Sequence, residues 1–312
     1  MAAGRLETLR LASGSLLADV VPSLGGGVAR FDLASASGVI NVFRPWPGDG
    51  SSDPNSLGLY VLAPWSNRIS GGGFSFAGSF HPLMPNVTGE PFPLHGDAWQ
   101  KPWVVVDHHR HHVRLVREAD EVGPFRYGTQ LDYDLSSAGL SVRLVLDNLA
   151  ERALPFGAGF HPWFPRTPGT RLQAPAKSVW LEDRQHLPTG QISVASRSDW
   201  DFSRPRSLPN GWINNAFTGW NRNATVSWDD RGVALDIRSS PPIDAYILYS
   251  PAGDAPFFCF EPVTHTVDAH NLAPGPEAHG LVVLAPGASL IAECQFIVRA
   301  TLKSEPVQAD HP

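Results

Sequence analysis

Residues 139–147 read GLSVRLVLD, and this short stretch decides the fold class of the chain. Apolar side chains occupy every second position, and the positions between them are mostly polar. Side chains alternate between the two faces of a β-strand, so the pattern predicts an antiparallel strand with one buried face. The predicted buried face carries Leu140, Val142, Leu144 and Leu146, and the other carries Ser141, Arg143 and Asp147, with Val145 as the exception.

The same period of two recurs on both sides of this stretch, with glycine and proline turns between the apolar runs. Residues 16–21 and 28–33 flank a glycine-rich turn, and residues 225–237 and 281–297 each predict a β-hairpin. No window of helical length shows the period of an amphipathic helix. We therefore predict an all-β fold, a large antiparallel β-sandwich with few short helices.

The composition favours one large domain built from short strands. The chain has 312 residues, of which 42% are hydrophobic and 17% are charged, which is enough to bury a large core. Glycine and proline contribute 29 residues each, which suits many turns. No change in composition marks a linker before the C-terminal end. We predict a single β-sandwich domain over residues 1–303 and a disordered tail over residues 304–312.

The charge and cysteine content exclude several classes of partner. The formal net charge is −6 and the isoelectric point is about 6.0, so the basic footprint of a nucleic-acid-binding protein is absent. No apolar run reaches the ~18 residues that cross a membrane, and the N-terminus lacks the features of a signal peptide. Cys259 and Cys294 lie in apolar stretches, typical of buried free thiols in a reducing compartment. We expect a cytoplasmic monomer or homodimer.

Two residues stand out as candidate groups for proton transfer. His161 lies within FGAGFHPWFP, residues 156–165, where Gly159 indicates a close backbone approach and Pro162 stiffens the chain. Imidazole titrates near neutral pH, and the aromatic neighbours can bury its flanks. Glu261 ends the apolar run FFCFE, so burial should raise the pKa of its carboxyl group. The plain alternatives are a histidine in a turn and a salt-bridged strand end.

Three further candidates lie among turn residues. Arg68 offers a rigid fork of hydrogen-bond donors, and Asn67 before it offers both a donor and an acceptor. His95 precedes a glycine in the segment PLHG. Considered alone, the three are more typical of a surface arginine with a capping asparagine and of a solvent-facing loop histidine.

Two metal-binding interpretations compete with proton transfer. His95, His161 and Glu261 could form a triad of two histidines and one carboxylate, a ligand set that suits zinc or iron. The segment HHRHH, residues 108–112, is also rich in histidine. Adjacent side chains on a strand point to opposite faces, so this segment favours a solvated edge strand or loop over a metal site.

In this order the segments resemble the aldose 1-epimerase (galactose mutarotase) family, nearer to a less characterised bacterial branch of it. The similarity extends from about residue 20 to residue 298. Each motif is short, and their number and order make the resemblance specific. The matching pieces are NRI (67–69), HG (95–96), GFHPWF (159–164), LPTG (187–190), EP (261–262), Asn271 and LAPG (284–287).

The resemblance implies the galactose mutarotase-like supersandwich fold and an isomerase that interconverts the α and β anomers of a free monosaccharide, without cofactor or metal. Glu261 matches the general base that takes the proton of the C1 hydroxyl. His161 matches the general acid that protonates the ring oxygen and so opens the ring. His95 matches a second catalytic histidine beside the ring oxygen, and Arg68 matches a ligand to the sugar hydroxyls, with Asn67 next to it.

One position departs from the family pattern. Galactose mutarotases carry an acidic sugar ligand where this chain has INNAF, so Asn214 stands in place of a carboxylate and the preferred aldose stays open. Trp163, close to His161, is the expected aromatic wall for a pyranose face. Two other functions remain, a hexose-6-phosphate 1-epimerase, which would need a basic cluster, and a non-catalytic carbohydrate-binding protein on the same fold.

Overall fold

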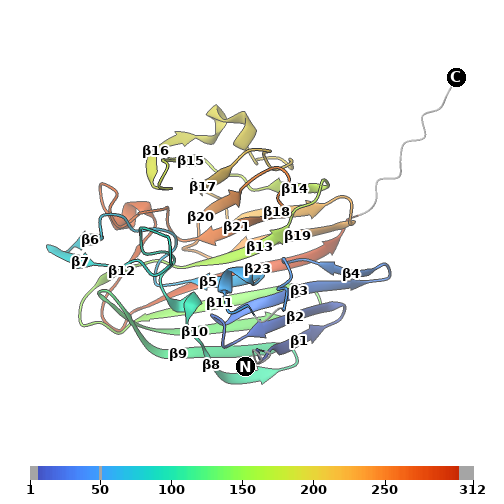
Figure 1. Ribbon diagram of the computed structural model, residues 1–312, viewed down its shortest axis with the longest axis horizontal. Coiled ribbons are helices and arrows are strands. Elements are labelled where there is room, and N and C mark those ends of the chain that lie inside the picture. The colour runs from blue at the N-terminus through green and yellow to red at the C-terminus, as the bar shows by residue number, and fades with distance from the viewer. Residues whose placement is uncertain (1–5, 49–50, 302–312) are drawn as a thin grey trace.

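Antiparallel β-strands make up most of the structure, a computed structural model that describes residues 6–48 and 51–301 (Figure 1). This confirms the prediction of an all-β fold with large antiparallel sheets. The tail predicted for residues 304–312 lies outside the described residues. No helix within the described ranges is long and apolar enough to cross a membrane.

The larger sheet contains eleven strands in the order β1-β2-β3-β5-β13-β21-β20-β17-β15-β16, with β4 paired to β3. Its strands are β1 (Leu9–Ser13), β2 (Leu16–Val21), β3 (Gly27–Ser35), β4 (Gly38–Asn41), β5 (Leu59–Leu62), β13 (Gly159–Pro165), β15 (Ser178–Glu182), β16 (Pro188–Ser193), β17 (Ile213–Thr218), β20 (Ala245–Ser250) and β21 (Phe257–Val263).

The smaller sheet contains eight strands in the order β14-β18-β19-β23-β11-β10-β9-β8. Its strands are β8 (Val104–His109), β9 (His112–Val122), β10 (Phe125–Leu135), β11 (Gly139–Asn148), β14 (Thr170–Gln173), β18 (Asn223–Trp228), β19 (Val233–Ser239) and β23 (Ser289–Ala300). The remaining elements are the pairs β6 (Gly73–Phe76) with β7 (Ser79–Pro82) and β12 (Leu154–Phe156) with β22 (Val282–Leu284), and the 3-10 turns η1 (Pro54–Ser56), η2 (Ala98–Gln100), η3 (Val194–Ser196), η4 (Ser198–Trp200) and η5 (Pro276–His279).

The stretch that decided the fold class is β11, in the middle of the smaller sheet between β10 and β23. The alternation is as predicted, because the four apolar positions from Leu140 to Leu146 are almost completely buried. Val145 is half-buried on the opposite face, together with the polar positions around it. The strand therefore contributes one apolar row to the space between the two sheets.

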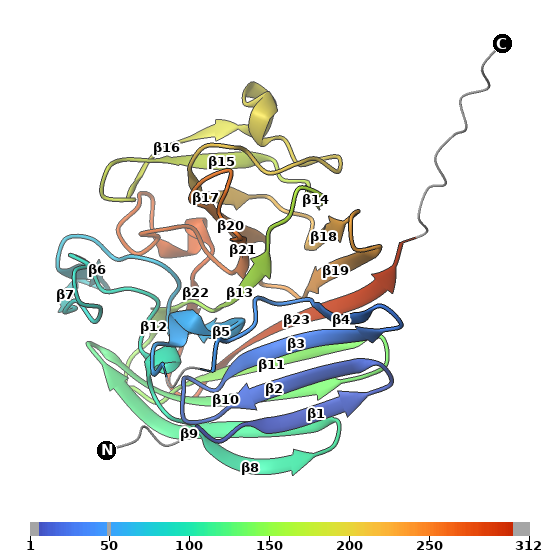
Figure 2. The ribbon, with the colours of Figure 1, turned by 45° about the vertical axis from the view of Figure 1, so that its right-hand side comes forward.

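The two sheets stack face to face, and Figure 2 shows β1, β2 and β3 as a layer over β10 and β11. Phe43 lies in the core between them, with its ring in edge-on contact with Phe31 of β3, Phe164 of β13 and Phe296 of β23. The Tyr133 hydroxyl of β10 also crosses the layers and donates a hydrogen bond to the carbonyl of Gly26 (2.8 Å). Apolar burial and these buried contacts hold the sandwich together.

One predicted pairing is wrong. The apolar runs in residues 281–297 become β22 and β23, yet they do not pair with each other. β22 pairs with β12, whereas β23 pairs with β11 and β19. The buried Asn148 side chain donates to the carbonyl of Leu284 (2.8 Å), and the backbone carbonyl of Asn148 accepts from the backbone N–H of Gly287 (2.8 Å). The turn therefore carries the chain from one sheet to another.

The other local predictions agree with the structure. Strands β2 and β3 pair across the glycine turn, and β18 and β19 form the hairpin predicted for residues 225–237. The histidine-rich segment 108–112 forms the β8–β9 turn, and β8 is the outermost strand of the smaller sheet. Cys259 and Cys294 are both free and buried, as expected.

Strand alternation gives the larger sheet a second apolar face, called here the outer face, which points away from the smaller sheet. Five consecutive strands of that sheet place side chains on it, including Tyr60, Trp163, Ala216, Ile247 and Cys259. These residues form a cluster separate from the main core between the sheets. The candidate site lies on this outer face.

Candidate active site

His161 and Glu261 face each other across two paired strands. The register pairs Gly159 with Val263 and Trp163 with Cys259, which puts His161 of β13 opposite Glu261 of β21. The Nε2 atom of His161 lies 3.3 Å from Oε1 of Glu261. Both side chains are strongly buried, with residue exposures of 6% and 3%. Residues 100 positions apart in the sequence therefore form one pair in the fold.

Burial moves the pKa values of the two groups in opposite directions. It raises the pKa of Glu261 from 4.5 to about 8, against a smaller lowering by the Arg68 charge. Burial, together with a smaller contribution from the charge of Arg44, lowers the pKa of His161 from 6.5 to about 3. At neutral pH the pair therefore carries one titratable proton, on the Glu261 carboxyl group, and the His161 imidazole is neutral. Nδ1 of His161 and Oε2 of Glu261 are buried without a hydrogen-bond partner.

Aromatic rings fix the orientation of the His161 imidazole. The Tyr60 ring of β5 stacks on the imidazole at 4.5 Å between ring centroids, and the Trp163 ring stacks on it at 5.2 Å. The guanidinium of Arg44 lies over the Trp163 ring, 3.8 Å from its centroid. Trp163 thus packs against His161, and its contact with Arg44 holds it in place, while its role as a wall for a sugar stays a prediction.

His95 reaches the same place from a loop. Its ring centroid lies 5.4 Å from that of His161, and η2 packs beside it with the Trp99 ring. The backbone N–H of Asn67 donates to Nδ1 of His95 (3.0 Å), so in the neutral ring the proton is on Nε2. Burial, followed by the nearby charges, lowers the pKa of His95 well below its usual range. The ring is therefore a neutral N–H donor.

The H-G motif has a backbone explanation. His95 and Gly96 both have positive φ, 63° and 65°, and Asn67 shares this left-handed conformation with φ of 58°. A Cβ atom at Gly96 would lie 1.9 Å from the carbonyl oxygen of Ala63, so only glycine fits. Asn67 supplies the N–H that holds His95, which gives it a positioning contact in addition to any contact with a ligand.

Arg68 lies close enough to influence Glu261, but its fork of donors is already engaged. Its Nε and Nη2 atoms donate to the two carboxylate oxygens of Glu90 at 3.0–3.1 Å. Its Nη1 atom donates to the Asn67 side chain (3.3 Å). The Arg68 charge is thus largely balanced within the protein.

Asn214 lies on the outer face, two strands away from Glu261 in the sheet order. Its side-chain amide donates to Glu182 of β15 (3.3 Å). The same carboxylate accepts from the indole N–H of Trp212 (2.7 Å) and contacts Nδ1 of His186 (2.9 Å). A carboxylate is therefore present next to the position where the family pattern has one, although it comes from a different strand.

In the structure, the residues that come together as potential metal ligands differ from the predicted triad. The side chains of His161, Cys259 and Glu261 bring potential ligand atoms within 4.8 Å of one another, the one such group in residues 6–48 and 51–301. His95 is not part of the group, so the triad of His95, His161 and Glu261 does not form. Burial raises the pKa of the Cys259 thiol well above its usual range, which disfavours the thiolate that binds metals.

Three residues near the site were missed from the sequence. Glu182 ends the apolar run SVWLE, the same pattern that drew attention to Glu261, and this signal could have found it. Tyr60 and Arg44 carry no comparable signal, because their contacts with His161 and Trp163 depend on strand pairing and on a loop.

A sequence profile of the aldose 1-epimerase family matches residues 7–296 of the chain. The uncharacterised protein YphB of Escherichia coli K12 is 35% identical over 290 residues, which cover 88% of this chain and 98% of that protein. The uncharacterised protein YihR of the same organism is 26% identical over 218 residues, 68% of each chain.

Solved structures show the same similarity. A crystal structure of a candidate aldose 1-epimerase from Escherichia coli K12 superposes with a TM-score of 0.86 at 33% identity, over 94% of this chain and 99% of that one. A galactose mutarotase-like protein of Clostridium acetobutylicum has the same fold, with a TM-score of 0.82 at 20% identity over 96% and 97% of the two chains. From the family match and these relatives, the chain belongs to the aldose 1-epimerase family.

Proposed function

We propose that the protein is an aldose 1-epimerase that interconverts the α and β anomers of a free aldose. The observation that carries this proposal is the directly opposed, buried pair of His161 and Glu261 on the outer face. The pair holds one proton at neutral pH, and its two remaining polar atoms have no partner in the protein. A sugar that presents a hydroxyl group and a ring oxygen supplies two partners of this kind.

In the proposed reaction the single proton of the pair moves through the sugar. Glu261 takes the proton of the C1 hydroxyl while His161 gives its proton to the ring oxygen, and the bond from C1 to the ring oxygen breaks. Rotation about the C1–C2 bond and reclosure by the reverse transfers give the other anomer. His95, as a neutral N–H donor, stabilises the ring oxygen while it takes up the proton.

The carboxyl group is the favoured place for this proton in the free protein. Ring opening therefore requires the proton to cross the 3.3 Å contact to His161 first, when the sugar arrives. After ring opening the proton is again on Glu261, the distribution that burial favours. The same environment thus stabilises the pair in the open-chain intermediate.

Other residues of the outer face have supporting roles in this proposal. Asn67 and the pair of Asn214 with Glu182 bind sugar hydroxyl groups, and Trp163 forms an apolar wall. Arg68 contributes one hydrogen bond to a hydroxyl group, through the Nη1 hydrogen that its contacts with Glu90 and Asn67 leave free. The proposed reaction uses only proton transfers between the sugar and side chains, so it requires no cofactor and no metal. Two buried free cysteines fit an enzyme of the cytoplasm.

A neutral sugar fits this face better than a sugar phosphate. Arg68 is balanced by Glu90, and Arg44 is stacked on Trp163 while its guanidinium donates to the carbonyl of Leu57 (3.2 Å). Glu182 adds negative charge at the far end of the face. A phosphate group needs free cationic donors, which these contacts remove.

The proposal is tested by following purified protein with fresh α-glucose and α-galactose in a polarimeter. We expect faster approach to anomeric equilibrium, and a loss of at least about 100-fold in His161→Ala and in Glu261→Ala. His109→Ala, at the exposed edge strand β8, is the control and should keep full activity. EDTA should have no effect. Binding of sugars without any acceleration would favour a non-catalytic carbohydrate-binding protein instead.

A further inference from the structure

A cavity of about 370 Å³ opens on the outer face next to the proposed site. Strands β15, β16, β17 and β20 provide one side of it, and the segment that follows β21 provides the other. Figures 1 and 2 show this segment, in orange-red with η5, alongside β17 and β20. None of the groups assigned above to proton transfer lines this cavity.

The strand register connects the cavity with the acid–base pair. Ile247 of β20 is the register partner of Glu261, and Ala245, which lines the cavity, is the partner of Val263. Ala245 and Ile247 point to the same face, about 7 Å apart along the strand. Glu261 and Ile247 belong to one row of neighbouring side chains across the strands, and Val263 and Ala245 belong to the next row. The cavity therefore begins in the row next to that of Glu261, where the side chain of Ala245 is small.

The lining combines an aromatic wall with hydrogen-bonding groups. Trp180 of β15 forms the wall and is held by an edge-on contact with His279, at 5.7 Å between ring centroids. The Trp180 indole N–H and the Thr266 hydroxyl are both buried without a partner. The Gln191 side chain of β16 donates to Thr218 (2.7 Å) at the rim. An aromatic ring beside planar amides and hydroxyl groups suits the alternating apolar and polar surfaces of a sugar.

The charge of the lining disfavours anionic ligands. Asp244 and Glu277 both line the cavity, and no lysine or arginine is among its described lining residues. Carboxylates accept hydrogen bonds from hydroxyl groups but repel phosphate and sulfate groups. The chemistry therefore points to a neutral, hydroxyl-rich ligand.

We propose that this cavity is a second sugar subsite, and that the substrate is the reducing end of a disaccharide or longer oligosaccharide. The reducing ring occupies the acid–base pair, and the next ring lies against Trp180. This inference rests on the proposed function for the reducing ring. It adds a second sugar ring, and the cavity that would hold this ring lies in the adjoining row of side chains on the same face of the sheet.

The test compares sugars that share a reducing-end glucose. The kcat/KM for mutarotation of maltose and cellobiose is measured by polarimetry and compared with that of glucose. We expect at least one of the disaccharides to exceed glucose by about fivefold to tenfold, the size of one aromatic contact. Trp180→Ala should remove this advantage and leave the value for glucose within about twofold of wild type.

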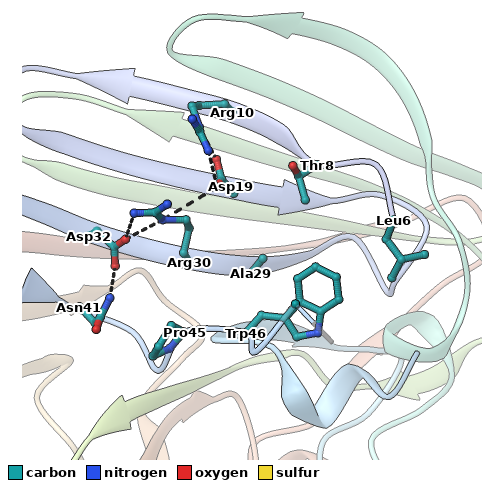
Figure 3. Close-up of a pocket in the computed structure, with 11 residues that line it drawn as sticks. Leu6, Thr8, Arg10, Asp19, Ala29, Arg30, Asp32, Asn41, Pro45 and Trp46 are labelled. Carbon is teal, nitrogen blue, oxygen red and sulfur yellow. Dashed lines mark hydrogen bonds and ion pairs between the residues drawn. The ribbon is translucent and has the colours of Figure 1, made fainter. Parts of the chain in front are cut away.

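Two further variants guard against misfolding and general effects. Gln191→Ala changes an exposed side chain on the edge strand β16 and should weaken the preference for the disaccharide without loss of structure. Trp46→Ala is the matched control, because Trp46 is also half-buried, has an unpartnered indole N–H and lines a cavity of about 320 Å³ (Figure 3).

The control cavity lies over β1–β4, and its charged groups pair with each other. Arg10 donates to Asp19 (2.8 Å), and Arg30 donates to Asp32 (2.6 Å). Trp46→Ala should therefore leave both kcat/KM values unchanged. Far-ultraviolet circular dichroism and the melting temperature show that each variant is folded before rates are compared.

Each outcome decides the proposal. The second subsite is wrong if Trp180→Ala lowers kcat/KM equally for glucose and for the disaccharide, or if the disaccharides react no faster than glucose. In both cases the proposed function stands. If no sugar is accelerated, the proposed function fails, and calorimetric titration of the Glu261→Gln variant decides the subsite. Maltose or cellobiose binding that Trp180→Ala abolishes keeps the subsite, and equal binding with and without Trp180 removes it.

Discussion

Replacement of Glu261 by glutamine should stabilise the protein and inactivate it at the same time. The carboxyl group is 3% exposed, and burial raises its pKa from 4.5 to about 8. The unfolded chain ionises this group above pH 4.5, whereas the folded protein keeps it protonated. Its contribution to stability is therefore fully present below pH 4.5 and is lost as the pH rises through about 8.

The magnitude follows from the gap between the two pKa values. At pH 7 the unfolded carboxyl group is 2.5 pH units above its pKa of 4.5, which lowers the free energy of unfolding by about 3 kcal/mol. Glutamine has the same shape and does not ionise, so Glu261→Gln should be more stable by about 3 kcal/mol at pH 7. For a chain of this length the melting temperature should rise by about 5 °C.

Urea denaturation, followed by tryptophan fluorescence, measures this difference. We expect the gain of Glu261→Gln to fall below about 1 kcal/mol at pH 5, where less ionisation is available to the unfolded chain. Two results would refute the reasoning. No gain at pH 7 would mean that Glu261 is ionised in the folded protein and paired with a charged His161. The same gain at both pH values would mean that the gain does not come from the ionisation of Glu261.

Three further predictions concern the same site. The kcat/KM for mutarotation should fall as the pH rises through about 8, because the pair of His161 and Glu261 then loses its single proton, and a flat profile up to pH 10 would contradict this. Gly96→Ala should lower the free energy of unfolding by about 3 kcal/mol, because its Cβ atom would meet the Ala63 carbonyl oxygen, and urea denaturation measures it. Glu182→Ala should raise the KM for the sugar about fivefold to tenfold with little change in kcat, since it releases the Asn214 amide, and an unchanged KM would separate Asn214 from the site.

Local patterns in the sequence were sufficient to predict the strands. Alternation predicted β11, and turn residues predicted the β2–β3 and β18–β19 pairs, because hairpins are formed by neighbouring segments. The pairing of β22 with β12 could not be read in this way, since it joins segments more than 100 residues apart, and Asn148 contacts Leu284 only in the folded chain. Periodicity gives a strand its faces and gives no information on distant partners.

For the candidate site, too, local features could be predicted from the sequence and long-range contacts could not. His161 and Glu261 attracted attention through their apolar surroundings, which burial confirms. Their direct opposition depends on the register of β13 and β21, which no local pattern contains. The missing carboxylate at Asn214 is a similar case, because Glu182 arrives from the neighbouring strand β15. A single-sequence comparison of motifs detects a replacement at one position and overlooks a carboxylate that another strand places beside it.

The central claim is that the opposed pair of His161 and Glu261 transfers the proton that opens the sugar ring. The most direct measurement is the initial rate of α-glucose mutarotation with wild type and with the His161→Gln and Glu261→Gln variants, each shown to be folded. The account predicts clear acceleration by the wild type and a loss of at least about 100-fold in each variant. Wild-type rates in either variant would contradict it.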